Sequence, residues 1–117
     1  MRSSISFGFS EIEQLLSSLG ISLRYTGYRY VEDSLMLMLG DETRIHSVTK
    51  CLYPEIALKY RTSITAVERN IRTLSLVAWR DRRLYLETIS GRTLEKRPTS
   101  SEFLAILYGW LTAGRYV

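Results

Sequence analysis

The fold is decided by residues 54–79, which read PEIALKYRTSITAVERNIRTLSLVAW. Pro54 suits the first turn of a helix, because the amide that proline lacks would be unbonded there. Thr62 and Ser63 are N-cap candidates for a second, longer helix, which we expect to run from Ser63 to Trp79. Two helices joined by so short a turn are typical of a helix-turn-helix.

The apolar residues of this stretch predict how its two helices pack. On the second helix a buried face advances at three- and four-residue spacings through Val67, Ile71, Leu74 and Ala78. The first helix would cover this face with Ile56, Ala57 and Tyr60. Because alanine is small, the two helices can approach closely at their crossing. The opposite face of the second helix is then held outward.

That outward face carries the candidate DNA-contacting residues. Arg69 can donate two hydrogen bonds to O6 and N7 of guanine, and Glu68 can accept one from N4 of cytosine. We expect both to contact bases, with Ala66 and Thr73 beside them. Taken without the helix-turn-helix pattern, Glu68 and Arg69 would more simply form a surface ion pair on a solvated helix.

Residues at the rim of the same face are expected to contact phosphates, together with the free amides at the start of the helix. They are Lys59, Arg61, Thr62, Ser63, Thr65 and Arg72. Leu76 also falls on the outward face although it is apolar. Either a contact with the last helix or a contact with a partner subunit would explain an apolar residue at this position.

Basic charge is concentrated in the same region. Residues 59–83 hold seven basic and two acidic side chains, a balance of +5, whereas the whole chain carries +4. The remainder is therefore close to neutral, at −1. Such localisation is expected of a surface that neutralises the phosphates of double-stranded DNA, although a solvated helix face gives the same count.

The rest of the chain predicts further helices and no linker. We expect helices at 11–19, 28–39, 46–52, 55–60 and 100–112, and leave residues 84–89 open between strand and helix. Capping boxes are predicted at Ser10 with Glu13 and at Thr99 with Glu102, and Gly20 is expected to stop the first helix. Residues 1–117 should form one all-α domain of about six helices, fraying at the first handful of residues and at 113–117.

Composition excludes several classes of protein. Hydrophobic residues make up 45% and charged residues 24%, which is the balance of a folded domain. No apolar run is long enough to span a bilayer and no secretory signal is present, so a cytoplasmic location is expected. One cysteine and one histidine support neither a disulfide nor a zinc cluster, and we expect no metal or cofactor. Cys51, Trp79 and Trp110 are expected in the core.

An enzyme is disfavoured by the same survey. The carboxylates are scattered, no phosphate-binding loop is present, and no nucleophile has a base partner. His46 alone, expected at the surface or in a helix cap, is weak evidence for catalysis.

Several blocks of the sequence are similar to those of a known family. In order they are Leu19-Gly20-Ile21, Gly27-Tyr28-Arg29-Tyr30, Ser47-Val48-Thr49-Lys50, Leu52-Tyr53-Pro54, Val67-Glu68-Arg69-Asn70-Ile71-Arg72, Val77-Ala78-Trp79 and Pro98-Thr99-Ser100-Ser101-Glu102-Phe103. Together they resemble the C-terminal DNA-binding domain of the stage-zero sporulation response regulator of endospore-forming bacteria. The resemblance runs from about Ile12 to Leu111.

The resemblance implies a six-helix domain that binds a short GC-containing operator box, often as two copies on adjacent boxes. The family's base contacts match at Glu68 and Arg69, and its following arginine matches at Arg72. Where the family has an arginine before the Val-Glu-Arg block this chain has Ala66, and where it has a histidine this chain has Thr73. An altered or relaxed preference at one or two base pairs is therefore expected. The resemblance also implies that the segment 84–89 lies where the family touches RNA polymerase.

The family's regulator carries a receiver domain about as long as this whole chain, so its control is expected to differ from that of the present protein. We expect a free-standing paralogue, which Met1 and an ordered first helix favour, rather than an excised fragment. A second hypothesis, motivated by the missing receiver and by Ala66, is a protein-interaction module that tunes or antagonises a full-length relative.

Overall fold

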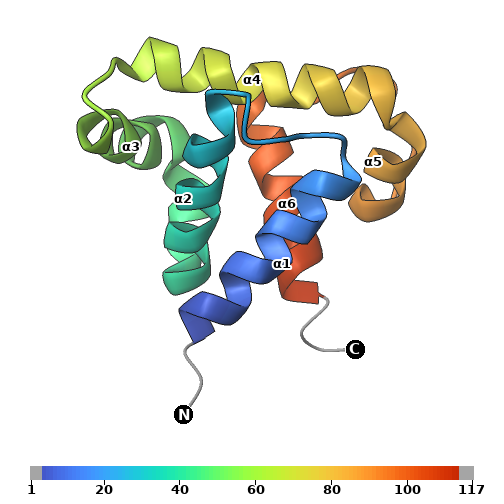
Figure 1. The fold of residues 1–117 in the computed structure, drawn as a ribbon, viewed down its shortest axis with the longest axis horizontal. Helices are drawn as coiled ribbons and strands as arrows, with labels where there is room; N and C mark the ends of the chain where they lie inside the picture. Colours follow the sequence, from blue (N-terminus) through green and yellow to red (C-terminus); the bar gives the residue numbers. More distant parts are fainter. Residues whose placement is uncertain (1–3, 114–117) are drawn as a thin grey trace.

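Helices form every element of the structure, a computed structural model that describes residues 4–113 (Figure 1). In chain order they are α1 (Ser4–Ser18), α2 (Gly27–Gly40), the short segments η1 (Glu42–Ser47) and η2 (Val48–Leu52), α3 (Tyr53–Lys59), α4 (Ile64–Asp81), α5 (Arg83–Ser90) and α6 (Ser100–Ala113). The predicted all-α class with six principal helices is confirmed.

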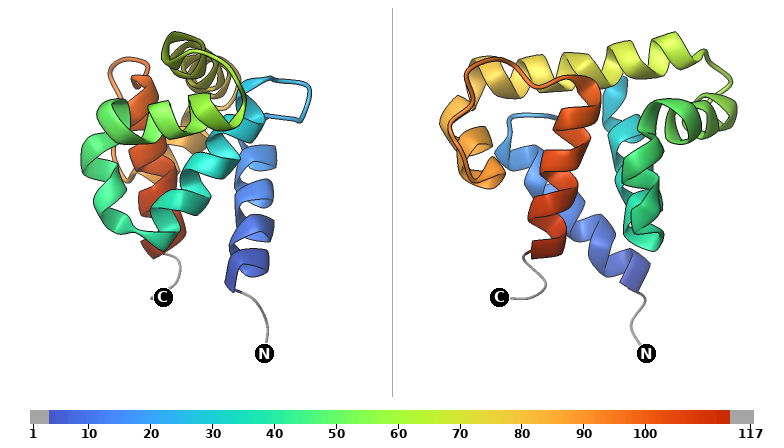
Figure 2. Two further views of the ribbon diagram at one scale, coloured as in Figure 1. Left: turned by 90° about the vertical axis from the view of Figure 1, so that its left-hand side faces the viewer. Right: turned by 180° about the vertical axis from the view of Figure 1, so that it is seen from behind.

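Helix α4 lies across one end of the molecule, and α1, α2 and α6 extend away from it (Figures 1 and 2). One core cluster is shared by all six principal helices. The face of α4 predicted to be buried is confirmed, because the side chains of Val67, Ile71, Leu74 and Ala78 are fully inaccessible.

The first residue of α2 touches the backbone of α4. A Cβ atom added to Gly27 would lie 2.3 Å from the carbonyl oxygen of Asn70 and 3.2 Å from Cγ of Leu74. No side chain fits in that space, so only glycine allows α2 to begin so close to α4. This contact fixes the middle of α4 on the end of α2.

Helix α1 begins earlier than predicted, at Ser4 rather than near residue 11. The capping box at Ser10 and Glu13 is wrong, because Ser10 lies inside the helix. No proline interrupts the residues before it, so nothing prevents the helix from extending toward the N-terminus. The predicted stop is correct: Gly20 has a φ of 79°, and the amide of Ile21 donates to the carbonyl of Leu16 at 2.9 Å.

The segment left open at 84–89 is the helix α5. Leu86 and Ile89, three positions apart, are its buried residues, and Gly91 with a φ of 75° ends it. Arg82 is the single residue between α4 and α5 and takes the bend between them.

The capping box before α6 is confirmed. The Thr99 amide donates to Glu102 Oε1 at 2.9 Å, and the Glu102 amide donates to Thr99 Oγ1 at 3.2 Å. The fraying predicted for the chain ends lies mostly at residues 1–3 and 114–117, outside the described residues.

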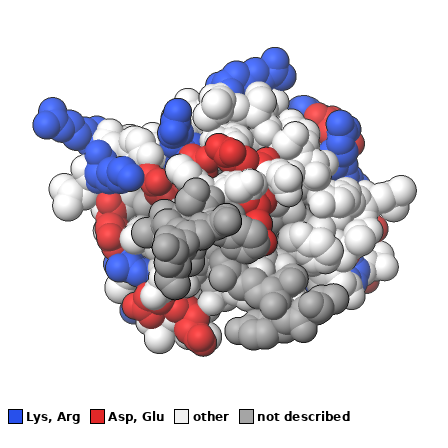
Figure 3. All heavy atoms as spheres, turned by 60° about the horizontal axis from the view of Figure 1, so that its bottom comes forward, with Lys and Arg blue, Asp and Glu red and all other residues white. Residues whose placement is uncertain are grey.

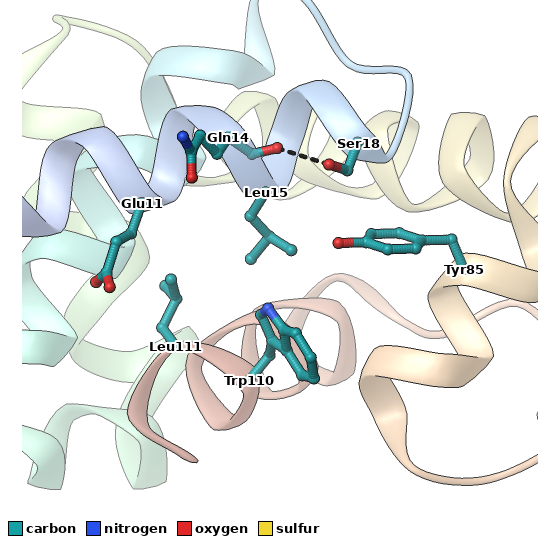
Figure 4. A pocket seen from close by; sticks show the side chains of 7 residues that line it. All are labelled: Glu11, Gln14, Leu15, Ser18, Tyr85, Trp110 and Leu111. Carbon is teal, nitrogen blue, oxygen red and sulfur yellow. Dashed lines mark hydrogen bonds between the residues drawn. The ribbon is translucent and has the colours of Figure 1, made fainter. Parts of the chain in front are cut away.

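Two residues expected in the core are exposed. Cys51 faces outward because its segment buries Val48 and Leu52, four positions apart, on the other side. Trp110 is 43% exposed, at the rim of a hollow of about 240 Å³ between α1, α5 and α6. Figure 4 shows the residues that line this hollow, among them Leu15 of α1 and Tyr85 of α5. Trp79 is only partly buried, against the edge of the core.

We predict that Gly27→Ala lowers the free energy of unfolding by at least about 1–3 kcal/mol, as overpacked sites do, because the new Cβ meets a backbone carbonyl. Gly40→Ala is the matched control, since a Cβ at Gly40 would meet nothing within 4 Å and alanine favours the helix. Urea unfolding measures both variants. Equal stabilities for the two would contradict the close contact.

Candidate nucleic-acid interface

The turn between α3 and α4 is a Schellman motif. The amide of Thr62 donates to the carbonyl of Ala57 at 2.9 Å, and that of Arg61 donates to Leu58 at 3.3 Å. Arg61 has a φ of 54°, the left-handed conformation that glycine usually adopts at this position. The chain thus reverses within a few residues and points the charged Arg61 side chain into solvent.

Ser63 caps the start of α4. Its Oγ accepts a hydrogen bond from the amide of Ala66 at 3.0 Å, as predicted for an N-cap. Its hydroxyl proton stays available for a second acceptor, such as a phosphate oxygen. The neighbouring candidate, Thr62, is half-buried and is not the cap.

The structure brings the predicted base-contacting residues to one accessible face of α4. Arg69 and Thr73 are exposed, and Glu68 and Ala66 are half-buried beside them. Arg69 makes no ion pair with the residues that the structure describes. The Thr73 hydroxyl donates to the carbonyl of Arg69 at 3.1 Å, so its proton is already used within the helix.

Glu68 and Arg72 form an ion pair along the helix, with Arg72 Nη2 at 3.5 Å from Glu68 Oε1. Pairs of this spacing on a helix surface contribute only about 0.3–0.5 kcal/mol. A good bidentate base contact is worth about 1–3 kcal/mol, so DNA binding can replace the pair.

Lys59, a predicted phosphate contact, forms an ion pair with a residue of α2. Its Nζ lies 2.9 Å from Oδ2 of Asp33, which also accepts a hydrogen bond from the Tyr60 hydroxyl. Burial, followed by this hydrogen bond, raises the pKa of Tyr60, so the phenol stays neutral at physiological pH. Two of the residues that end α3 are thus anchored on one carboxylate, which the sequence did not reveal because Asp33 lies in a different helix.

The C-terminal half of α4 also uses its arginines within the fold. Arg80 pairs with Asp81 at 2.8 Å. Arg83, just after α4, stacks its guanidinium 3.9 Å from the ring centroid of Trp79 and pairs with Glu87 at 3.6 Å. The basic balance counted from the sequence therefore overstates the charge free to meet DNA, which is concentrated toward the start of α4.

The end of the molecule away from α4 has a different character. Among the described residues in this view, Figure 3 shows acidic side chains between uncharged ones and most basic side chains toward the margin. Because phosphates repel carboxylates, this face is the less suitable one for DNA.

The comparison with protein families agrees with this geometry. The family described as "Sporulation initiation factor Spo0A C terminal" matches residues 12–111. The chain belongs to this family. Since the Spo0A C-terminal family is a DNA-binding effector domain, the chain is a DNA-binding regulator. The resemblance inferred from the Leu-Tyr-Pro and Val-Glu-Arg blocks is thereby confirmed.

Two further observations on this member of the Spo0A C-terminal family concern metal ions and membranes. Within residues 4–113, no three His, Cys, Asp or Glu side chains lie close enough together to hold a metal ion. No helix in that range has both the length and the apolar character to cross a membrane.

Two side-chain hydrogen bonds of α4 were not predicted from the sequence. Ser75 is fully buried and donates to the carbonyl of Pro98 at 2.8 Å, and Asn70 Nδ2 donates to the carbonyl of Ala66 at 2.8 Å. Position 75 lies about 80° from Val67 around the helix, at the edge of the buried face. The hydrogen bond of Ser75 could not be predicted from this position, because its partner Pro98 is remote in sequence.

We predict that Arg61→Gly raises the free energy of unfolding by about 0.5–1 kcal/mol, because glycine adopts the left-handed conformation without the cost that a Cβ imposes. Arg61→Ala removes the same charge but keeps the Cβ, and should give no such gain. Chemical unfolding of both variants checks this, and a stabilised Arg61→Ala would contradict the backbone explanation.

Proposed function

We propose that the chain is a sequence-specific transcription regulator that places α4, the recognition helix predicted at 63–79, in the major groove of a short operator box. One observation carries the proposal: Arg69 is exposed on the outer face of α4 and is unpaired among the described residues. Since a guanidinium so placed can bind guanine through two hydrogen bonds, Arg69 is the main base contact and Glu68 the second.

Backbone contacts surround these two residues. Arg61, Thr65 and Arg72 are exposed, and Thr62 and Ser63 contribute hydroxyls at the turn. Lys59 joins them by leaving the pair with Asp33 when a phosphate is near. These contacts position the helix but carry no sequence information.

Ala66 and Thr73 limit the specificity. The methyl group of Ala66 cannot donate to a base, and the Thr73 proton is bonded to the carbonyl of Arg69. Base pairs opposite these two positions are therefore expected to be weakly discriminated or to favour an apolar contact such as the thymine methyl group.

We also propose two protein partners on the basis of the family resemblance. One is a second copy of the chain on an adjacent box, and the other is RNA polymerase through residues 84–89. On α5, Leu84 is 80% exposed and offers an apolar group for such a contact.

The alternative function is a protein-interaction module that tunes a full-length relative without reading DNA itself. It is favoured by position 66, where this chain has an alanine and the family has an arginine. Cellular activity that survives Arg69→Ala, together with co-purification of the relative in the absence of DNA, would support this alternative over the first proposal.

We predict that Arg69→Ala weakens binding to a family-type operator box by about 1–3 kcal/mol and leaves binding to a scrambled duplex much less affected. Arg82→Ala is the control, because it removes the same charge from an exposed position at the far end of α4. Fluorescence anisotropy across a salt series measures both. Equal losses for the two variants, or a wild type without preference for the box, would contradict the proposal.

We predict that Ala66→Arg adds a base contact and raises discrimination at one base pair of the box by about 1–3 kcal/mol. Affinities for duplexes that differ only at that pair provide the measurement. Ala66→Lys serves as control for the added charge. If Ala66→Arg raised the affinity equally on all duplexes, the gain would come from charge alone and would contradict a base contact.

A further inference from the structure

The loop between α5 and α6 runs beside the recognition helix. In the rear view of Figure 2 it passes along α4 from the end of α5 to the start of α6. The hydrogen bond from Ser75 Oγ to the carbonyl of Pro98, 2.8 Å long, joins this loop to the fourth turn of α4. Residues remote in sequence are thus adjacent to the DNA-contacting helix.

The loop is held at two points. Leu94 is buried, its amide donates to Glu87 Oε2 at 2.8 Å, and its carbonyl accepts from Arg83 Nη2 at 2.7 Å. Pro98 is also buried and is bonded to Ser75. The three residues between these anchors have little freedom to move away from α4.

Those three residues are exposed, and two of them are cations. They are Glu95, Lys96 and Arg97, and Arg92 adds a further exposed cation near the start of the loop. Neither Lys96 nor Arg97 makes an ion pair with another residue in 4–113. Unlike Arg80 and Arg83, these two charges are therefore not used within the fold.

The side of α4 on which the loop lies is also defined. Ser75 follows Arg72 by three residues, so both are on the same flank of the helix, whereas Gly27 of α2 contacts the opposite flank through Asn70. When α4 occupies a major groove about 12 Å wide, a phosphate strand passes along each of its flanks. The strand on the Arg72 side then faces the loop.

We propose that Lys96 and Arg97 bind the phosphates of that strand, as a second backbone-contacting element outside the helix-turn-helix. The inference rests on the proposed placement of α4 in the major groove. Because the loop is anchored before DNA arrives, ordering it adds little entropic cost to binding. Its contribution is electrostatic and independent of sequence.

The test compares Lys96→Gln and Arg97→Gln with Lys50→Gln, which makes the same change of charge at an exposed position in η2. Each variant is titrated with the box duplex and a scrambled duplex over a salt series. Each loop variant should make the slope of log K against log salt less negative by about 0.9, the value of one phosphate contact, and leave the ratio of box to scrambled affinity unchanged. Lys50→Gln should leave the slope at the wild-type value.

Two loop variants that both behave like Lys50→Gln, on a protein that still prefers the box, would overturn this inference alone. A less negative slope for the loop variants of a protein that shows no preference for the box would support the loop contact while the proposed sequence specificity fails. All three positions are exposed, and thermal unfolding of each variant confirms that a loss of affinity does not come from a loss of fold.

Discussion

The close approach of Gly27 to the carbonyl of Asn70 is the constraint on which the rest of the structure depends. It places the start of α2 against the backbone in the middle of α4, at a distance that no side chain permits. With α4 fixed there, its apolar face covers the ends of α2 and α6, and its charged face stays open to solvent. The turn at Arg61 and the Ser63 cap then set where α4 begins.

Charge is divided along α4 between holding the fold and meeting a partner. Toward the C-terminus, Arg80 is paired with Asp81, and Arg83 is stacked on Trp79 and bonded to the α5–α6 loop. Toward the N-terminus, Arg69 is free of ion pairs within the described chain, and the pair of Glu68 with Arg72 is weak enough to be exchanged for DNA. The N-terminal half of α4, whose charged side chains make the fewest contacts within the fold, is the half that the helix-turn-helix exposes to a partner.

Local signals in the sequence were sufficient for the helix-turn-helix itself. Pro54, the Ser63 cap and the spacing from Val67 to Ala78 are properties of neighbouring residues, and each was predicted correctly. So was the Thr99 capping box. The Ser10 box failed because the same residue types also occur inside helices, and only the preceding residues decide whether a helix has already begun.

What the sequence did not reveal depends on partners that are distant along the chain. Lys59 is held by Asp33 and Ser75 by the carbonyl of Pro98, and neither partner is marked by any periodicity. The exposure of Trp110 likewise depends on how far α1 and α5 stand from α6.

The most direct test of the account is an NMR titration of the isotopically labelled chain with an operator duplex, following backbone amides and arginine Nε–H groups. We expect the largest shifts at residues 61–73, a new protected Nε–H signal for Arg69, and little change for Arg83. Shifts concentrated on α1 and α6, with the Arg69 signal unchanged, would contradict the claim that α4 is the DNA-contacting helix.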